Sequence, residues 1–236
     1  MIFTLLFIVG LAAFIGWWLL GQGLAAKPWL ETGAPGTVAE TGASPLPTAK
    51  IGLGVFLAVA SSLLVLLVSA YTMRMDMEDW RPLPQPWLLW VNTGVLAASG
   101  VALHRAQVAA RRRELEGIRS WLLTGGLAAI AFLLGQLLAW KQLVAAGYRM
   151  TTNPADAFFY LITAIHGLHV LGGLVALGRT GGKLRRGVGM EALRLSVELC
   201  ATYWHFLLAV WVVLFVLLAY SPSIAWLYAI CTGSFG

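Results

Sequence analysis

Six long apolar stretches alternate with shorter polar segments along this chain of 236 residues. A transmembrane α-helix needs about 20 mostly apolar residues to cross roughly 30 Å of bilayer hydrocarbon, and every stretch has about that length. The stretches cover residues 2–21, 51–73, 86–104, 121–143, 157–177 and 196–220. The pattern therefore predicts an all-α fold, a polytopic bundle of about six transmembrane helices.

The first stretch is separated from the other five by residues 22–49, which are rich in Gly, Ala and Pro and show no apolar period. We interpret residues 1–21 as an accessory transmembrane helix, because a cleaved signal has a basic start and a shorter apolar region. Residues 22–49 are expected to form a loop or tether. Residues 50–220 then make a five-helix transmembrane domain, followed by a short apolar tail at 221–236.

Composition and charge support a membrane protein and indicate its orientation. Hydrophobic residues make up 59% of the chain and charged residues 11%, whereas about a quarter of a soluble domain is charged. The net charge is +6, but the basic residues lie mostly in short loops, where they set orientation. Loops after the first, third and fifth stretches carry twelve Lys and Arg, and those after the second and fourth carry four. The positive-inside rule then places both termini outside, and we expect no nucleic-acid partner.

The fifth and sixth stretches carry polar groups near their middle, where a central charge costs roughly 2 to 3 kcal/mol on insertion scales. His166 and His169 are three residues apart and share one helix face, and Glu198 and His205 are seven apart and share another. We expect these two faces to meet and to form one polar core.

Three interpretations of this core stay open from the residues alone. It could be a buried polar network that fixes helix packing and binds lipid headgroups, or a proton-handling site, since Glu and His are usual relay groups in membranes. It could also ligate a b-type haem, in which case His205 or His104 would be needed as the second axial ligand. The chain has two cysteines, Cys200 and Cys231, and lacks the C-x-x-C-H pattern of covalent haem attachment.

Other polar and aromatic residues in the stretches are expected to serve packing. Asn92, Thr93 and Gln136 are predicted to join interhelical hydrogen bonds. Most of the eleven tryptophans fall near stretch ends, as an aromatic belt would, whereas Trp204 and Trp211 lie deeper. No phosphate-binding loop, dinucleotide fingerprint or catalytic triad is recognisable, and we expect no catalytic residue and no metal ligand in the chain.

Three motifs together resemble subunit III of the haem-copper cytochrome c oxidases. The string IHGLHVLGG at 165–173 resembles the family's F-H-G-L-H-V-x-x-G, and ELCATYWHF at 198–206 is similar to its E-A-A-A-W-Y-W-H-F. The segment NTGVLAASG at 92–100 resembles L-N-T-x-x-L-L-A-S-G. These motifs occur in the family's order within the five later stretches.

The resemblance implies a non-catalytic accessory subunit of a proton-pumping terminal oxidase in aerobic respiration. It implies a multi-pass protein of a bacterial-type inner (plasma) membrane, which stabilises catalytic subunit I, lies in the same complex as subunit II and supports proton uptake. Haem and copper would belong to those partner subunits, with no cofactor bound by this chain except structural phospholipids. Transferred by motif, the polar core would comprise His166, His169, Glu198 and His205, and Trp204, Tyr203 and Trp211 would contact lipid.

The sequence also departs from the family pattern. No carboxylate occurs in 51–73, and the family's Q-A-S-E-Y-Y-E is replaced by QLLAWKQ at 136–142. These losses weaken a proton-antenna role. Related alternatives are subunit III of a quinol oxidase or the accessory protein of nitric oxide reductase. A more distant class is a free-standing transporter or a b-haem quinone-binding anchor.

Overall fold

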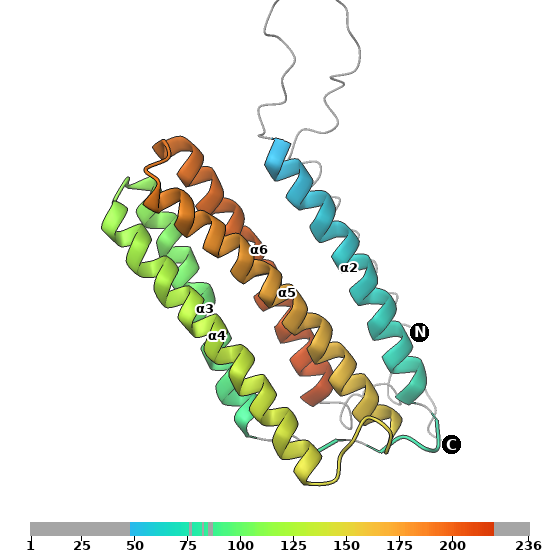
Figure 1. Ribbon diagram of the computed structural model, residues 1–236. Helices are drawn as coiled ribbons and strands as arrows, with labels where there is room; N and C mark the ends of the chain where they lie inside the picture. The colour runs from blue at the N-terminus through green and yellow to red at the C-terminus, as the bar shows by residue number, and fades with distance from the viewer. Residues whose placement is uncertain (1–47, 76, 82, 85–86, 220–236) are drawn as a thin grey trace, which may run out of the picture. The chain divides into compact units, whose positions relative to one another are not determined.

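The computed structural model describes residues 48–75, 77–81, 83–84 and 87–219, and every regular element among them is an α-helix. The helices are α2 (Thr48–Met75), α3 (Leu88–Arg111), α4 (Leu115–Ala145), α5 (Pro154–Arg185) and α6 (Met190–Ala219) (Figure 1). The predicted first helix, nearly all of the tether and the tail at 221–236 lie outside the described residues. The chain divides between Ala70 and Tyr71 into two units, and each is described by itself.

Four of the described helices, α2, α4, α5 and α6, are long and apolar enough to cross a membrane. α3 is not among them, because Asn92-Thr93 and His104-Arg105 dilute its apolar run. The structure thus supports an all-helical membrane protein with four candidate spans among the described residues, whereas the expectation was about six. Most helices extend beyond the predicted apolar stretches. For example, α5 continues to Arg185, although the fifth stretch ends at residue 177. Such an extension needs no apolar side chains, because a helix satisfies its backbone hydrogen bonds within its own segment.

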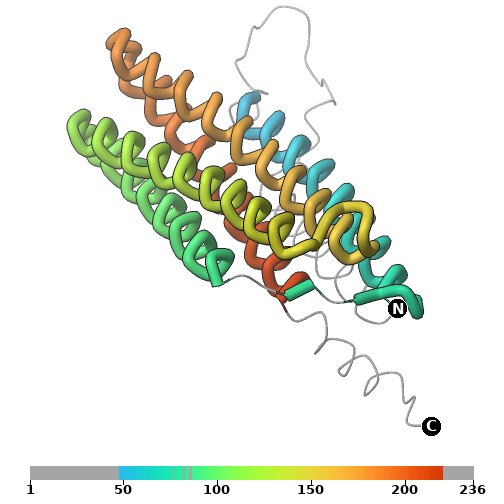
Figure 2. The backbone as a smooth tube through the Cα atoms, turned by 60° about the horizontal axis from the view of Figure 1, so that its bottom comes forward, coloured from blue at the N-terminus to red at the C-terminus, as the bar shows by residue number. Residues whose placement is uncertain are grey.

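In the second unit, α3, α4, α5 and α6 pack as a four-helix bundle in which each helix contacts two others (Figure 2). α3 packs against α4 and α6, and α5 also packs against α4 and α6. Short turns join the consecutive helices, and the turn after α5 uses Gly187 at a φ of 65°, a conformation that glycine adopts without steric cost. Side chains from all four helices therefore meet along the axis of the bundle.

Small residues permit the closest helix contacts in the bundle. A Cβ atom added to Gly173 of α5 would lie 2.6 Å from the Trp204 ring of α6. A Cβ added to Gly135 of α4 would overlap the side-chain oxygen of Asn92 on α3. Because lipid gives no hydrophobic drive to helix association, such close packing supplies much of the interaction.

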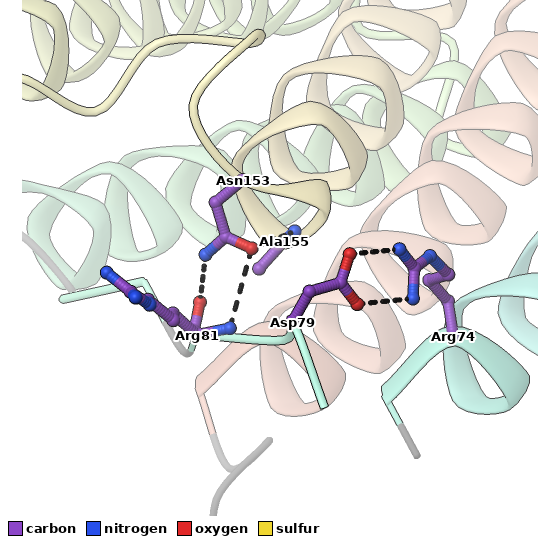
Figure 3. A network of polar contacts seen from close by, with 5 residues as sticks. All are labelled: Arg74, Asp79, Arg81, Asn153 and Ala155. Carbon is purple, nitrogen blue, oxygen red and sulfur yellow. Dashed lines mark hydrogen bonds and ion pairs between the residues drawn. The ribbon is translucent and has the colours of Figure 1, made fainter. Parts of the chain in front are cut away.

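A polar network fixes the loop that precedes α3 onto the start of α5 (Figure 3). Asn153 is the N-cap of α5 and accepts a hydrogen bond from the backbone N–H of Ala155 at 3.3 Å. Its amide also donates to the Arg81 carbonyl at 2.5 Å. Arg74, in the last turn of α2, donates from its guanidinium to both carboxylate oxygens of Asp79 in this loop at 2.7 and 2.5 Å. This hydrogen bonding lowers the pKa of Asp79 below its ordinary value of 3.8.

Candidate functional site

Asn92 and Gln136 join α3 to α4 inside the bundle. The Asn92 amide nitrogen donates to the backbone oxygen of Phe132 at 3.0 Å and to the side-chain oxygen of Gln136 at 3.2 Å. Both polar side chains are buried, and Gly135 provides the space that Asn92 occupies. The interhelical hydrogen bond predicted for these two residues is present, and it fixes the register of α3 against α4.

His166 lies in an aromatic environment at the centre of the bundle and is only 3% exposed. Its ring is 5.8 Å from the Phe132 ring of α4 and 4.9 Å from the Trp211 ring of α6, centroid to centroid. Neither ring nitrogen has a hydrogen-bond partner among the described residues. Trp211 in turn donates its indole N–H to the Thr93 hydroxyl at 3.0 Å. The imidazole therefore packs as an aromatic ring between three helices.

The other three members of the expected polar core lie elsewhere, which corrects that expectation. His169 is half-buried, and its Nδ1 lies 2.8 Å from the carbonyl oxygen of Ile165 on its own helix. Glu198 is half-buried, just over two turns from the start of α6. His205 is exposed, and its ring contacts that of His104 on α3 at 5.6 Å between centroids.

Helix geometry explains why the cluster divides. On α6 the side that packs into the bundle carries Trp204, and the next residue, His205, points about 100° away. His205 therefore turns toward α3 instead of toward His166 on α5. A bis-histidine haem site would need His205 or His104 opposite a histidine of α5, and the structure instead places these two against each other.

The lipid contact expected of the deep aromatic residues is also wrong. Trp204 is 0% exposed, Trp211 1% and Tyr203 9%, so none of them presents a surface to lipid. Trp204 donates its indole N–H to the Ser99 hydroxyl at 2.8 Å, and Ser99 donates to the Gly125 carbonyl at 2.8 Å. Trp204 and Ser99 thus tie α6 to α3 and α4.

Several residues of these networks were not singled out by sequence reasoning. Ser99 lies beside Gly100 in a run of small residues on α3, and this position is a signal for a buried hydroxyl. Trp140 donates to the Thr163 hydroxyl at 3.1 Å and joins α4 to α5. Asp156 is fully buried in the first turn of α5, and neither of its carboxylate oxygens has a described hydrogen-bond partner.

Taken together, the arrangement is suited to holding helices together. In the part of the chain that the structure describes, no three His, Cys, Asp and Glu side chains lie close enough to share a metal ion. The paired polar groups of α3, α4 and α6 bond to one another across helix interfaces. His166 and Asp156 differ from them, because they are buried without such a bond.

Comparison with known proteins matches the chain to the family model described as cytochrome c oxidase subunit III, over residues 51–223. A protein named cytochrome c oxidase subunit 3 from Synechocystis sp. is 33% identical over 172 residues, which cover 70% of this chain and 72% of the relative. One of the same name from Thermostichus vulcanus is 34% identical over 174 residues, covering 71% and 85%. A probable cytochrome c oxidase subunit 3 from Mycobacterium tuberculosis is 34% identical over 145 residues, covering 58% and 69%. The family match spans all of α3 to α6 and most of α2.

Proposed function

Because the chain belongs to the cytochrome c oxidase subunit III family, we propose that it stabilises the catalytic subunit of a proton-pumping haem-copper oxidase. Family membership makes it an accessory subunit of a membrane-bound respiratory oxidase. The finer proposal is that it binds subunit I directly, shares the complex with subunit II and receives no electrons itself. Cytochrome c is the proposed electron donor, and haem and copper are held by the partner subunits.

One structural observation favours a role for the bundle in stabilising a partner subunit. The hydrogen-bonded polar groups at the centre of α3 to α6 satisfy one another across helix interfaces, as in the chain from Trp204 through Ser99 to Gly125. Such pairs stabilise membrane helix contacts by about 0.6 kcal/mol on average. A rigid bundle of this kind provides a constant surface for a larger partner.

The proposed location is a bacterial-type plasma membrane, with the C-terminus on the outer side. The basic residues of the chain support this orientation. Arg111 ends α3 and is followed by Arg112 and Arg113, and Arg185 ends α5 and is followed by Arg186. We further propose that phospholipids bind along the aliphatic outer faces of α4 and α5, since the deep tryptophans are buried. Support of proton uptake is proposed through the structure of the complex, with Glu198 as the residue to test.

The test is purification of the tagged full-length chain from its native membrane in mild detergent. The expected result is copurification of a haem- and copper-containing subunit together with oxidation of cytochrome c. Deletion of the chain should shorten the turnover lifetime of the remaining oxidase, with reintroduction of the wild-type chain as the control. If Glu198 serves packing alone, Glu198→Gln should change proton pumping only slightly.

Each other outcome selects a different function. A complex that oxidises quinol and leaves cytochrome c unoxidised would identify a quinol oxidase subunit, and reduction of nitric oxide would identify the accessory protein of that reductase. A lone chain with a stoichiometric Soret band would contradict the accessory role and favour a b-haem membrane anchor. Unchanged lifetime on deletion would contradict the stabilising role.

A further inference from the structure

The exposed surface of the four-helix bundle is of two kinds. On α4 and α5 it carries large aliphatic side chains such as Leu123, Leu127, Leu134, Leu161, Leu168 and Val175. Leu127 and Leu168 are each 66% exposed. Lipid tails are as apolar as leucine, so these outer faces are suited to direct contact with the bilayer.

The surface beside the contact between α3 and α6 is different. Apart from the aliphatic Val101, its exposed positions are small or polar, and we name the five together the histidine face: Val101 and His104 of α3 with Thr202, His205 and Ala209 of α6. The two imidazole rings are 5.6 Å apart between centroids and stand at 80° to each other. No hydrogen bond joins either ring to another side chain in the part of the chain that the structure describes.

The histidine face lies at membrane depth. His205 is near the midpoint of α6, which runs over 30 residues from Met190 to Ala219, so it lies roughly 20 Å from either end at 1.5 Å per residue. The contact with His104 places both rings at one level. α6 is also one of the four helices apolar enough to span the bilayer.

Two exposed imidazoles at this depth need a polar partner outside the bundle. Ionisable residues within membrane spans almost always face protein or a water-filled cavity, because lipid offers their polar atoms no hydrogen bond. We propose that the histidine face docks against a transmembrane helix of another oxidase subunit, which offers a hydrogen-bond acceptor, such as a carboxylate or carboxamide oxygen, to His104 and His205. This inference rests on the proposed function and names the surface through which it is exercised.

The remaining apolar segments of this chain are poorly suited to that position. Residues 2–21, 48–70 and 220–236 contain no Asp, Glu, Asn or Gln. The hydroxyls of these segments, such as those of Ser61 and Ser62, which donate to carbonyls of their own helix at 2.8 Å, are neutral acceptors and lack the carboxylate or carboxamide oxygen named above. A second copy of this chain would bring two more imidazoles against the first pair. An acceptor at this depth therefore comes most directly from a different subunit.

Size and hydrogen-bonding capacity agree with a helix as the occupant. Ala209 and Thr202 are small and exposed, so a neighbouring helix can approach closely. Arg105, the residue after His104, is also exposed, but its guanidinium lies over the Trp121 ring of α4, 5.1 Å from the ring centroid, and so belongs to the contact between α3 and α4. The donors of the histidine face are the two imidazole N–H groups, which complement a partner that offers acceptors.

The first experiment maps the face within the intact oxidase in native membranes. A photo-reactive phenylalanine derivative replaces Thr202 or Ala209, and matched controls carry it at Leu127 of α4 or Leu168 of α5. We expect the two face positions to cross-link to a transmembrane segment of another subunit and the two controls to give lipid adducts. Cross-links from the face to residues 2–21 or 48–70, to a second copy or only to lipid would overturn the inference, as would partner cross-links confined to the controls.

The second experiment tests the histidines. The double variant His104→Leu with His205→Leu should reduce the amount of this chain retained with the oxidase several-fold, while the isolated full-length chain keeps or raises its melting temperature in detergent. Leu127→Ala with Leu168→Ala is the control and should leave retention unchanged. Wild-type retention of the double histidine variant would overturn the inference. Failure of the wild-type chain itself to copurify with an oxidase would instead reject the proposed function.

Discussion

Two adjacent glycines of α5 offer a sharp test of the packing described for the bundle. An added Cβ at Gly173 would lie 2.6 Å from Trp204 Cζ3 and 3.0 Å from Tyr203 Cε1, both on α6. An added Cβ at Gly172 meets no atom within 4 Å. Both residues lie in the interior of the same helix, so the intrinsic helix preference of alanine acts equally at the two positions.

The expected effects have opposite signs. Replacing a helical glycine by alanine gains about 1 kcal/mol of helix propensity, and Gly172→Ala should keep most of that gain. In Gly173→Ala the same gain is opposed by overpacking against a fully buried indole, which typically costs about 1 to 3 kcal/mol. Trp204 cannot yield easily, because its N–H is bonded to Ser99. The two variants should therefore differ by about 1 to 3 kcal/mol in the free energy of unfolding.

The measurement is reversible unfolding of the full-length chain in mixed micelles, followed by tryptophan fluorescence. Wild type, Gly172→Ala and Gly173→Ala are compared under one set of conditions. We expect Gly173→Ala to be less stable than Gly172→Ala and also to perturb the fluorescence of the folded state. Equal unfolding free energies in the two variants would refute the close approach of α5 to α6 at Trp204.

Three further predictions follow from the polar contacts. Ser99→Ala leaves the buried indole N–H of Trp204 without its acceptor and should lower the unfolding free energy by about 1 to 2 kcal/mol. The control Ser120→Ala, on an exposed turn of helix α4, should change it by less than about 0.5 kcal/mol. Similar losses in the two variants would contradict the network. Asn153→Ala removes an N-cap and should cost about 1 kcal/mol, measured as faster hydrogen exchange in the first turn of α5 than in wild type. Arg74 lowers the pKa of Asp79 below 3.8, so this ion pair stabilises the fold above pH 3.8, and its contribution is lost as the pH falls through the lowered pKa. The melting-temperature difference between wild type and Asp79→Asn should therefore vanish in strong acid. A difference that persists there would be evidence against the ion pair.

The existence and centres of the helices could be predicted from sequence because they depend on local properties. An apolar run of about 20 residues predicts a spanning helix wherever it occurs, and the five later stretches each contain the centre of a described helix. The ends could not be predicted from polarity, since α3 continues past the charged Arg105 to Arg111 and α5 continues past Arg179 and Lys183 to Arg185. Hydropathy reports where the hydrocarbon ends, whereas the helix ends where its backbone bonding ends.

The candidate site was less predictable because it depends on which helices are neighbours. The seven-residue spacing of Glu198 and His205 establishes a common face of one helix, but it does not say which helix that face meets. The structure shows that His205 meets α3 through His104, which no pattern within α5 and α6 could indicate. In the same way, the family resemblance implied lipid contact for Trp204 and Trp211, and burial between helices excludes it.

The polar residues at membrane depth fall into two groups, those with a hydrogen-bond partner inside the bundle and those without one. Asn92, Ser99 and Trp204 are accounted for by the bundle, because each is paired with another helix. His104 and His205 are not accounted for in this way, since their rings are exposed and bond to no other described side chain. A free-standing bundle in lipid would gain stability if leucine replaced both histidines, because unpaired polar groups are costly in hydrocarbon. Their presence is therefore explained better by the assembled oxidase, in which a second subunit covers the face, than by the fold of this chain.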